Sequence, residues 1–184
     1  REHWSGFAKE AQASHLVFLD ESGVNINMTR RYGWGKGGRR VVDHTPLNTP
    51  KSTTILSSIR LDGEMAFTTF PGGTTADRFL TYLKETLIPT LRPGDIVVMD
   101  NLRTHHIQAV GELLHSVGVD VLYLPPYSPD LNPIEKLWSK LKAILRKLCV
   151  RSPELLASAI RFAFSCVSED DCAGWFHCSG YCLF

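Results

Sequence analysis

Three acidic residues stand at points of the chain where the backbone would hold them in place. Asp20 and Asp100 each follow a short apolar run, and Glu135 follows the stretch 125–133, which contains four prolines. Proline fixes its own backbone and restricts the residue before it, so the position of Glu135 is closely defined. Carboxylate oxygens are the ligands that Mg²⁺ and Mn²⁺ prefer, and three converging acids would form a divalent-metal site. Two such ions about 3.5–4 Å apart can stabilise both oxygens of an in-line phosphoryl displacement.

Each acid also fits an ordinary structural role. Asp20, with Ser22 close behind it, fits an Asx turn at a strand end, and Asp100 fits the same turn before a helix. Glu135 fits the return contact of a capping box with Asn132. Residue types and spacing alone therefore leave both interpretations open, a metal site and a set of turns and caps.

The elements around these acids alternate between strand and helix. Period-two and continuous apolar patterns predict strands over 16–19, 52–59, 64–70, 95–100 and 119–124. Helical spacing predicts helices over 76–88, 107–117, 133–148 and 153–167, followed by a short tail rich in cysteine and aromatic residues. Asp62-Gly63 predicts a hairpin turn, and Thr75 and Asn132 are predicted N-caps. This order predicts an α/β fold, and ligands of open α/β sheets bind at the carboxyl ends of strands, where two of the acids fall.

The composition excludes several classes of protein. With 184 residues, 43% of them hydrophobic, the chain is long enough for one folded domain and is neither disordered nor fibrous. A formal net charge of +1 excludes a uniformly basic surface. The five cysteines are odd in number and lie only between 149 and 182, which argues against a secreted disulfide framework. No apolar run approaches the roughly 18 residues of a membrane span, so we expect a cytoplasmic protein without membrane contact.

Three motifs together resemble the catalytic core of mariner-like DDE transposases, most closely the bacterial insertion-sequence branch. They are Leu19-Asp20-Glu21-Ser22-Gly23, Val98-Met99-Asp100-Asn101 with His105, and Tyr127-Ser128-Pro129-Asp130-Leu131-Asn132-Pro133-Ile134-Glu135. The stretch 32–35 and the ending around 175–181 resemble that branch as well, so the likeness covers nearly the whole chain. One departure is His106, where bacterial relatives often carry Lys or Arg.

The resemblance implies a fold and a division of the chain. The fold is α/β, with a ribonuclease-H-like mixed sheet flanked by helices. Residues 15–150 would form the DDE catalytic domain, 1–14 an N-terminal remnant or linker, and 151–184 a C-terminal helical tail packed on the core. Members normally carry N-terminal helix-turn-helix modules, for which there is no room before His15, so we expect this chain to be part of a longer product.

The resemblance also implies a site and a reaction. Asp20, Asp100 and Glu135 would be the catalytic, metal-binding triad for two Mg²⁺ ions, which Mn²⁺ can replace. Asp20 would bridge both ions, and each of the other two acids would complete one ion. The reaction would be hydrolysis at a transposon end, followed by attack of the freed 3′-hydroxyl on target DNA, usually at a TA step. The implied partners are transposon-end DNA, target DNA and a second copy of the chain, in a bacterial cytoplasm with the nucleoid. Three residues are predicted to support the site: Asn101, His105 and Asn132.

Two acid-free basic blocks lie next to two of these acids. Five cations stand between Glu21 and Asp43, and six more between 136 and 151. Such blocks fit either a solvated surface or contacts with the DNA backbone, and we favour DNA contact. The predicted DNA-binding residues are Arg30, Arg31, Lys36, Arg39, Arg40, Lys136, Lys140 and Lys147.

Other motifs support no competing chemistry. Gly33, Gly35 and Gly38 have the spacing of a dinucleotide-binding loop, but the residues that follow favour a strand rather than a helix. Trp34 and Trp138 are interpreted as core or scaffold aromatics, with DNA contact an alternative for Trp34 on its glycine-flanked loop. The tail cysteines lack the paired spacing of zinc ligands. Two alternative functions remain open, a ribonuclease-H-like nuclease without strand transfer and a catalytically silent DNA-binding or dimerising module.

Overall fold

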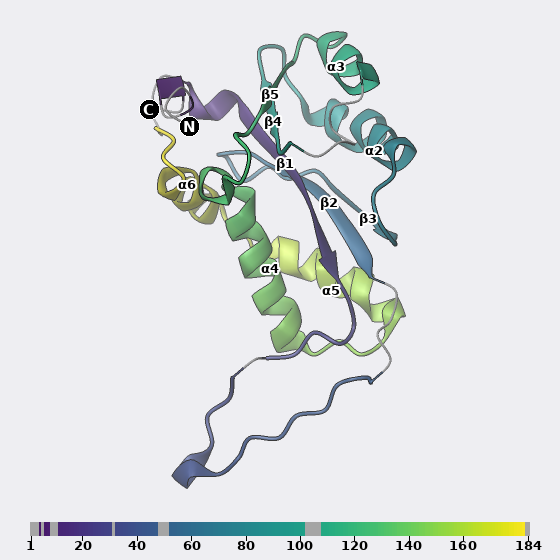
Figure 1. The fold of residues 1–184 in the computed structure, drawn as a ribbon, viewed down its shortest axis with the longest axis vertical. Helices are drawn as coiled ribbons and strands as arrows, with labels where there is room; N and C mark the ends of the chain where they lie inside the picture. Colours follow the sequence, from purple (N-terminus) through teal and green to yellow (C-terminus); the bar gives the residue numbers. More distant parts are fainter. Residues whose placement is uncertain are drawn as a thin grey trace.

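The strands assemble into one mixed sheet in the order β3-β2-β1-β4-β5 (Figure 1). The computed structural model describes residues 4, 6–7, 11–30, 32–47, 52–101 and 108–182. The strands are β1 (Leu16–Val24), β2 (Thr53–Ile59), β3 (Phe67–Pro71), β4 (Ile96–Met99) and β5 (Asp120–Tyr123). β1, β4 and β5 are parallel, whereas β2 is antiparallel to both β1 and β3. The predicted hairpin and mixed sheet are confirmed.

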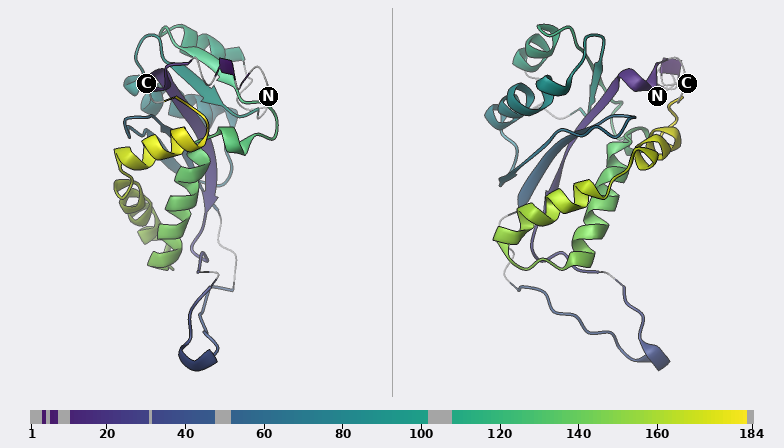
Figure 2. Two further views of the ribbon diagram at one scale, coloured as in Figure 1. Left: turned by 90° about the vertical axis from the view of Figure 1, so that its left-hand side faces the viewer. Right: turned by 180° about the vertical axis from the view of Figure 1, so that it is seen from behind.

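The helices form two layers, one on each face of the sheet (Figure 1 and Figure 2). The helices are α2 (Ala76–Tyr82), α3 (Gln108–His115), α4 (Ile134–Leu148), α5 (Pro153–Ser165) and α6 (Glu169–Cys178). α2 begins at the predicted cap, where the Thr75 hydroxyl accepts a hydrogen bond from the Arg78 N–H, and it continues as a π turn, Leu83–Leu87. Shorter 3-10 turns span Ala13–His15, Lys36–Gly38, Ile88–Thr90 and Pro129–Leu131.

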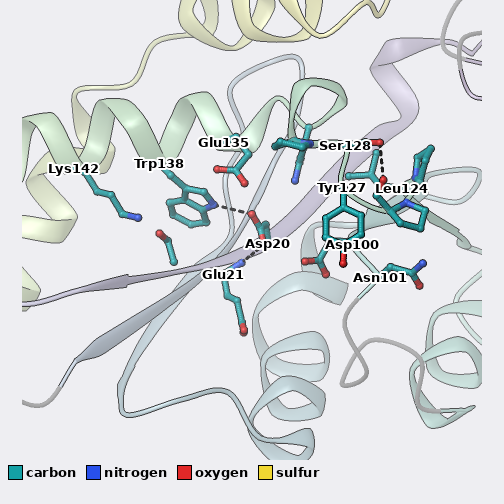
Figure 3. A pocket seen from close by; sticks show the side chains of 15 residues that line it. Asp20, Glu21, Asp100, Asn101, Leu124, Tyr127, Ser128, Glu135, Trp138 and Lys142 are labelled. Atoms are coloured by element: carbon teal, nitrogen blue, oxygen red, sulfur yellow. Dashed lines mark hydrogen bonds between the residues drawn. The ribbon is translucent and has the colours of Figure 1, made fainter. Parts of the chain in front are cut away.

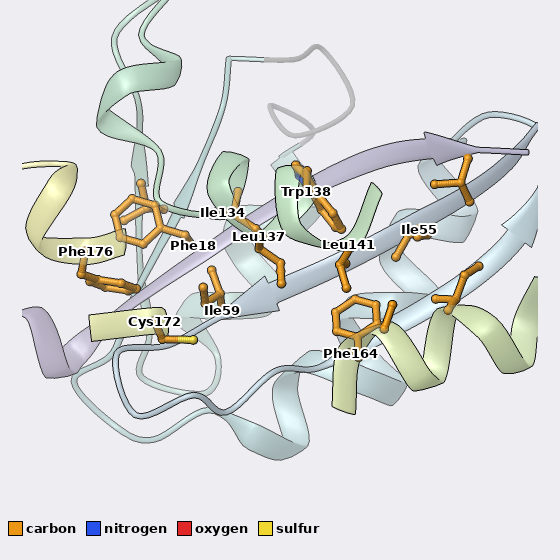
Figure 4. Packing of buried hydrophobic residues seen from close by; sticks show 14 of the residues in the cluster. Phe18, Ile55, Ile59, Ile134, Leu137, Trp138, Leu141, Phe164, Cys172 and Phe176 are labelled. Carbon is orange, nitrogen blue, oxygen red and sulfur yellow. The ribbon is translucent and has the colours of Figure 1, made fainter. Parts of the chain in front are cut away.

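Side chains along β1 alternate between the two layers. Leu16 and Phe18 pack in one hydrophobic cluster with α4, α5 and α6, and Val17 and Leu19 pack in a second cluster with α2 and α3. Figure 4 shows Phe18 beside residues of α4 and α6. Because successive side chains of a strand point to opposite faces, Asp20 continues the direction of Phe18 and points toward α4.

β1 is longer than predicted. The sequence pattern predicts a strand end at Asp20, but β1 continues to Val24 because β2 supplies backbone partners, with Asp20 opposite Ser57 and Val24 opposite Thr53. The parallel neighbour β4 pairs only as far as Leu19 opposite Met99. Asp20 therefore lies in a rigid strand, beside the point where β4 has ended.

The C-terminal segment contains a helix that the sequence analysis did not predict. α6 begins with a capping box in which the Ser168 hydroxyl accepts from the Asp171 N–H while the Asp171 carboxylate accepts from the Ser168 N–H. The sequence pattern did not single out this helix, because the cap uses Asp171 in place of the usual Glu or Gln. The division that makes 151–184 a C-terminal helical tail stays a prediction. Phe176 and Tyr181 pack against Phe18, so this segment completes the core around β1.

A long arm, residues 25–30 and 32–47 of the described chain, projects from the sheet beyond the C-terminal end of α4 (Figure 1). Arg151 anchors its base by donating to the carbonyls of Ile26 and Met28, at 3.0 and 2.8 Å. Trp34, on the arm, is fully exposed, so its interpretation as a core aromatic is wrong. Among the described residues, no helix combines the length and the apolar character that crossing a bilayer requires.

Candidate active site

One cavity of about 790 Å³ brings the three predicted acids together (Figure 3). Asp20 comes from β1, Asp100 from the position after β4, and Glu135 from the first turn of α4. The parallel register of β1 and β4 places Asp20 and Asp100 side by side. The proline-rich connector then positions the first turn of α4, with Glu135, beside them. The other lining residues are Glu21, Ser22, Asn101, Leu124, Pro125, Pro126, Tyr127, Ser128, Pro129, Asn132, Trp138 and Lys142.

Asp20 is held by two hydrogen bonds, one to each carboxylate oxygen. The backbone N–H of Glu21 donates to Oδ1 at 2.7 Å, and the indole Nε1–H of Trp138 donates to Oδ2 at 3.0 Å. Burial raises the pKa of Asp20 to about 7, the two hydrogen bonds oppose the rise, and the negative charges of Asp100 and Glu135 add to it. A nearby cation would relieve this unfavourable charge.

The donor set fits a divalent cation in its chemistry. All three acids supply oxygen ligands, the kind that Mg²⁺ and Mn²⁺ prefer. As the side chains stand, the described residues contain no group of three or more His, Cys, Asp or Glu gathered closely enough to hold an ion. The three acids therefore line one cavity, as predicted, but their side chains do not yet form a closed coordination sphere.

Asn132 does not cap α4 as predicted. Its side chain makes no capping hydrogen bond, and the helix begins at Ile134 after Pro133, while the backbone carbonyl of Asn132 accepts from the Glu135 N–H at 3.2 Å. Asn132 lines the cavity but is only 4% exposed, and among the described residues its buried Oδ1 has no hydrogen-bond partner. A buried acceptor without a partner costs free energy. Of the other predicted supporting residues, Asn101 lines the cavity, whereas His105 and the neighbouring His106 lie outside the described residues.

The predicted DNA-binding cations fall into two groups. Arg30, Lys36, Arg39 and Arg40 are exposed on the arm and do not line the cavity, and Arg31 lies outside the described residues. On α4, Lys136 donates to the Ser179 hydroxyl at 3.4 Å and Lys140 forms an ion pair with Asp171, so both turn toward the α6 side. Lys147 is exposed near the end of α4.

Several lining residues were not among the predicted site residues, and three of them, Lys142, Trp138 and Tyr127, bear on the chemistry of the cavity. Lys142 lies seven positions after Glu135 and four after Trp138, a helical spacing that puts all three on one face of α4, so the sequence contained this signal. Trp138 is buried in the core as expected and in addition donates to Asp20. Tyr127 is exposed at the cavity with a backbone φ of 54°, a left-handed conformation that non-glycine residues rarely adopt.

Residues 15–155 match the family described as DDE superfamily endonuclease. The chain belongs to this family. A comparison with curated proteins finds no match.

Solved structures of Mos1 transposase resemble the DDE endonuclease chain throughout its length. The mariner Mos1 paired-end complex with Mg aligns with a TM-score of 0.78 and 22% identity, over 97% of this chain and 56% of that chain. A pre-cleavage Mos1 transpososome aligns with a TM-score of 0.77 and 21% identity, over 96% of this chain and 56% of that chain. The catalytic domain of Mos1 mariner transposase aligns with a TM-score of 0.68 and 18% identity, over 96% of this chain and 82% of that chain. The likeness confirms the ribonuclease-H-like fold, and this chain spans just over half of the longer Mos1 chains.

Proposed function

We propose that this chain is the catalytic core of a mariner-like DDE transposase, which cuts DNA at transposon ends and transfers the ends to target DNA with Mg²⁺. The observation that supports the proposal is the set of three acids, from β1, β4 and α4, around one cavity. The family match adds support, because it covers the segment that contains all three acids.

The proposed roles follow from the surroundings of each side chain. Asp20, Asp100 and Glu135 would hold two divalent ions. When bound, these ions would activate the attacking oxygen and stabilise the leaving oxygen of the phosphodiester. Lys142 extends into the cavity from α4, and its positive charge is suited to a DNA phosphate (Figure 3).

We also propose DNA and a second copy of the chain as partners. Support for DNA comes from the arm cations and from Mos1, whose structures include a paired-end complex with the left transposon end. Support for the second copy is the arm itself, which exposes Tyr32, Trp34 and Leu47 away from the core. An origin in a bacterial insertion sequence, with action at the nucleoid in the cytoplasm, is part of the same proposal and rests on the sequence motifs alone.

The test is cleavage and joining by the full protein that contains this chain. The substrate is DNA carrying the ends of its own element, supplied with a target plasmid and Mg²⁺ or Mn²⁺. We expect Asp100→Asn and Glu135→Gln to reduce cleavage by roughly 10⁴-fold or more, since each removes a ligand of the ions that stabilise the transition state.

Asp130→Asn is the matched control, because Asp130 is an exposed acid of the same connector and does not line the cavity. Undiminished cleavage by the Asp100 and Glu135 variants would overturn the triad. Cut ends without joined target DNA would indicate a nuclease without strand transfer, and DNA binding without cleavage would indicate a silent module.

A further inference from the structure

The indole N–H of Trp138 joins α4 directly to Asp20, an acid of β1 that lines the cavity. Trp138 is buried, and its ring belongs to the core cluster that packs α4 on the sheet. Its Nε1–H donates to Asp20 Oδ2 across 118 positions of sequence (Figure 3).

Asp20 is oriented by two donors from different elements. Glu21 donates from the backbone of β1 to Oδ1, and Trp138 donates from α4 to Oδ2. Two fixed donors on two oxygens define the plane of the carboxylate. Each ionised oxygen has two lone pairs, so each retains one that a cation can use.

The same contact connects two of the acids. Glu135 precedes Trp138 by three positions on α4, and residues at this spacing lie on the same side of a helix. The hydrogen bond from Trp138 therefore fixes the strand that carries Asp20 against the helix turn that carries Glu135.

A purely structural role would require only that the buried indole N–H find an acceptor. The acceptor is instead a buried carboxylate of the proposed metal site, which has no cation partner among the described residues. We propose that Trp138 is a positioning residue that orients the Asp20 carboxylate for divalent cations. This inference rests on the proposed function. Groups that orient metal ligands in this way typically change metal affinity by about 10–100-fold when they are removed.

The test is Mn²⁺ binding by the metal-free protein, measured by isothermal titration calorimetry without DNA. Trp138→Phe keeps most of the ring volume and removes the N–H. We expect it to weaken Mn²⁺ affinity about tenfold or more. Trp4→Phe is the matched control, since Trp4 is also buried and its Nε1–H donates to the Tyr181 hydroxyl at 3.1 Å, outside the cavity. This control should bind Mn²⁺ like the wild type.

Equal Mn²⁺ affinity in Trp138→Phe and wild type would overturn this inference alone. Absence of Mn²⁺ binding by the wild type would overturn both the inference and the metal site of the proposed function. If Trp138→Phe fails to fold, NMR of the wild-type protein with ¹⁵N-labelled tryptophan tests the proposal instead. The Trp138 indole resonance should shift on titration with Mg²⁺ while that of Trp4 does not, and a Trp138 resonance unmoved at saturating Mg²⁺ would reject the proposal.

Discussion

Two buried aspartates, Asp20 and Asp95, lie near opposite ends of β4 and have opposite surroundings. Asp95, just before β4, is 1% exposed and forms an ion pair with Arg60, which is itself buried and also donates to the Thr90 carbonyl. Although burial opposes ionisation of Asp95, hydrogen bonds from Arg60 and the Arg92 N–H lower its pKa. Asp20 has no such cation among the described residues, and burial raises its pKa.

The difference separates a structural end of the sheet from a functional end. At the Asp95 end, the buried charges of Asp95 and Arg60 pair with each other, and this pair joins the ends of β2 and β4. At the Asp20 end, the fold buries a carboxylate with two further acids nearby and leaves its charge unmatched. Strongly perturbed acids in a cavity are typical of active sites, because the ligand supplies the missing charge.

The comparison predicts the largest loss of stability at the matched end. Asp95→Asn leaves the buried Arg60 charge with only the more exposed Glu64 as an ion-pair partner, at 3.5 Å from its Nε, so we expect the free energy of unfolding to fall by about 3–5 kcal/mol. Chemical denaturation measures this loss. Asp62→Asn is the control, because its ion pair with Arg92 is exposed and should contribute at most about 1 kcal/mol. Equal losses in the two variants would break the comparison.

The unmatched end predicts stabilisation by Mn²⁺ that depends on pH. At a concentration 100-fold above its dissociation constant, Mn²⁺ should add about 2.7 kcal/mol to the free energy of unfolding at pH 8. The same concentration should add much less at pH 5.5, because Asp20, with its pKa near 7, then holds a proton. Thermal unfolding with and without Mn²⁺ measures the effect. An equal Mn²⁺-induced rise in the melting temperature at pH 8 and at pH 5.5 would contradict Mn²⁺ binding by Asp20. So would the same rise in the Asp20→Asn variant.

The two aspartates also predict opposite pH dependence in the metal-free protein. The folded-state pKa of Asp20 is raised from 3.8 to about 7, so between these values the folded state binds more protons than the unfolded state. The free energy of unfolding should therefore fall with rising pH, by about 1 kcal/mol per pH unit from pH 5 to 6.5. The lowered pKa of Asp95 has the opposite effect, and its stabilisation is lost only as the pH falls below about 4. A slope between pH 5 and 6.5 that persists in Asp20→Asn would rule out Asp20 as its source.

The smallest predicted effect extends the comparison to two lysines of α4. Lys140 is paired with Asp171, whereas Lys142 lines the cavity with no ion-pair partner in the described part of the chain. Lys142→Met should weaken DNA binding at every sequence and reduce the slope of log affinity against log salt by about 1. Lys140→Met should leave that slope unchanged. Fluorescence anisotropy at several salt concentrations distinguishes the two variants. The reverse pattern would favour DNA contact through Lys136, Lys140 and Lys147, as the sequence predicts.

Local signals in the sequence predicted much of the fold. The Asp62-Gly63 turn, the Thr75 cap and the end of the α3 segment at Gly118 need only a few adjacent residues, and the structure contains each of them. The extension of β1 to Val24 could not be predicted in this way, because it depends on pairing with β2, about thirty residues further along the chain. Asn132 was assigned to a cap because its residue type and spacing fit one, yet its side chain makes no capping bond and lines the cavity instead.

The sequence by itself singled out Asp20, Asp100 and Glu135, because apolar runs, prolines and the motifs shared with DDE transposases mark these three acids. Only the tertiary structure decided what surrounds them. The hydrogen bond from Trp138 to Asp20, the pairing of Lys140 with Asp171 and the approach of Lys142 to the cavity all depend on how α4 lies between β1 and α6. Such contacts join residues far apart in sequence, and side-chain periodicity gives the face of a helix but not the element that it meets.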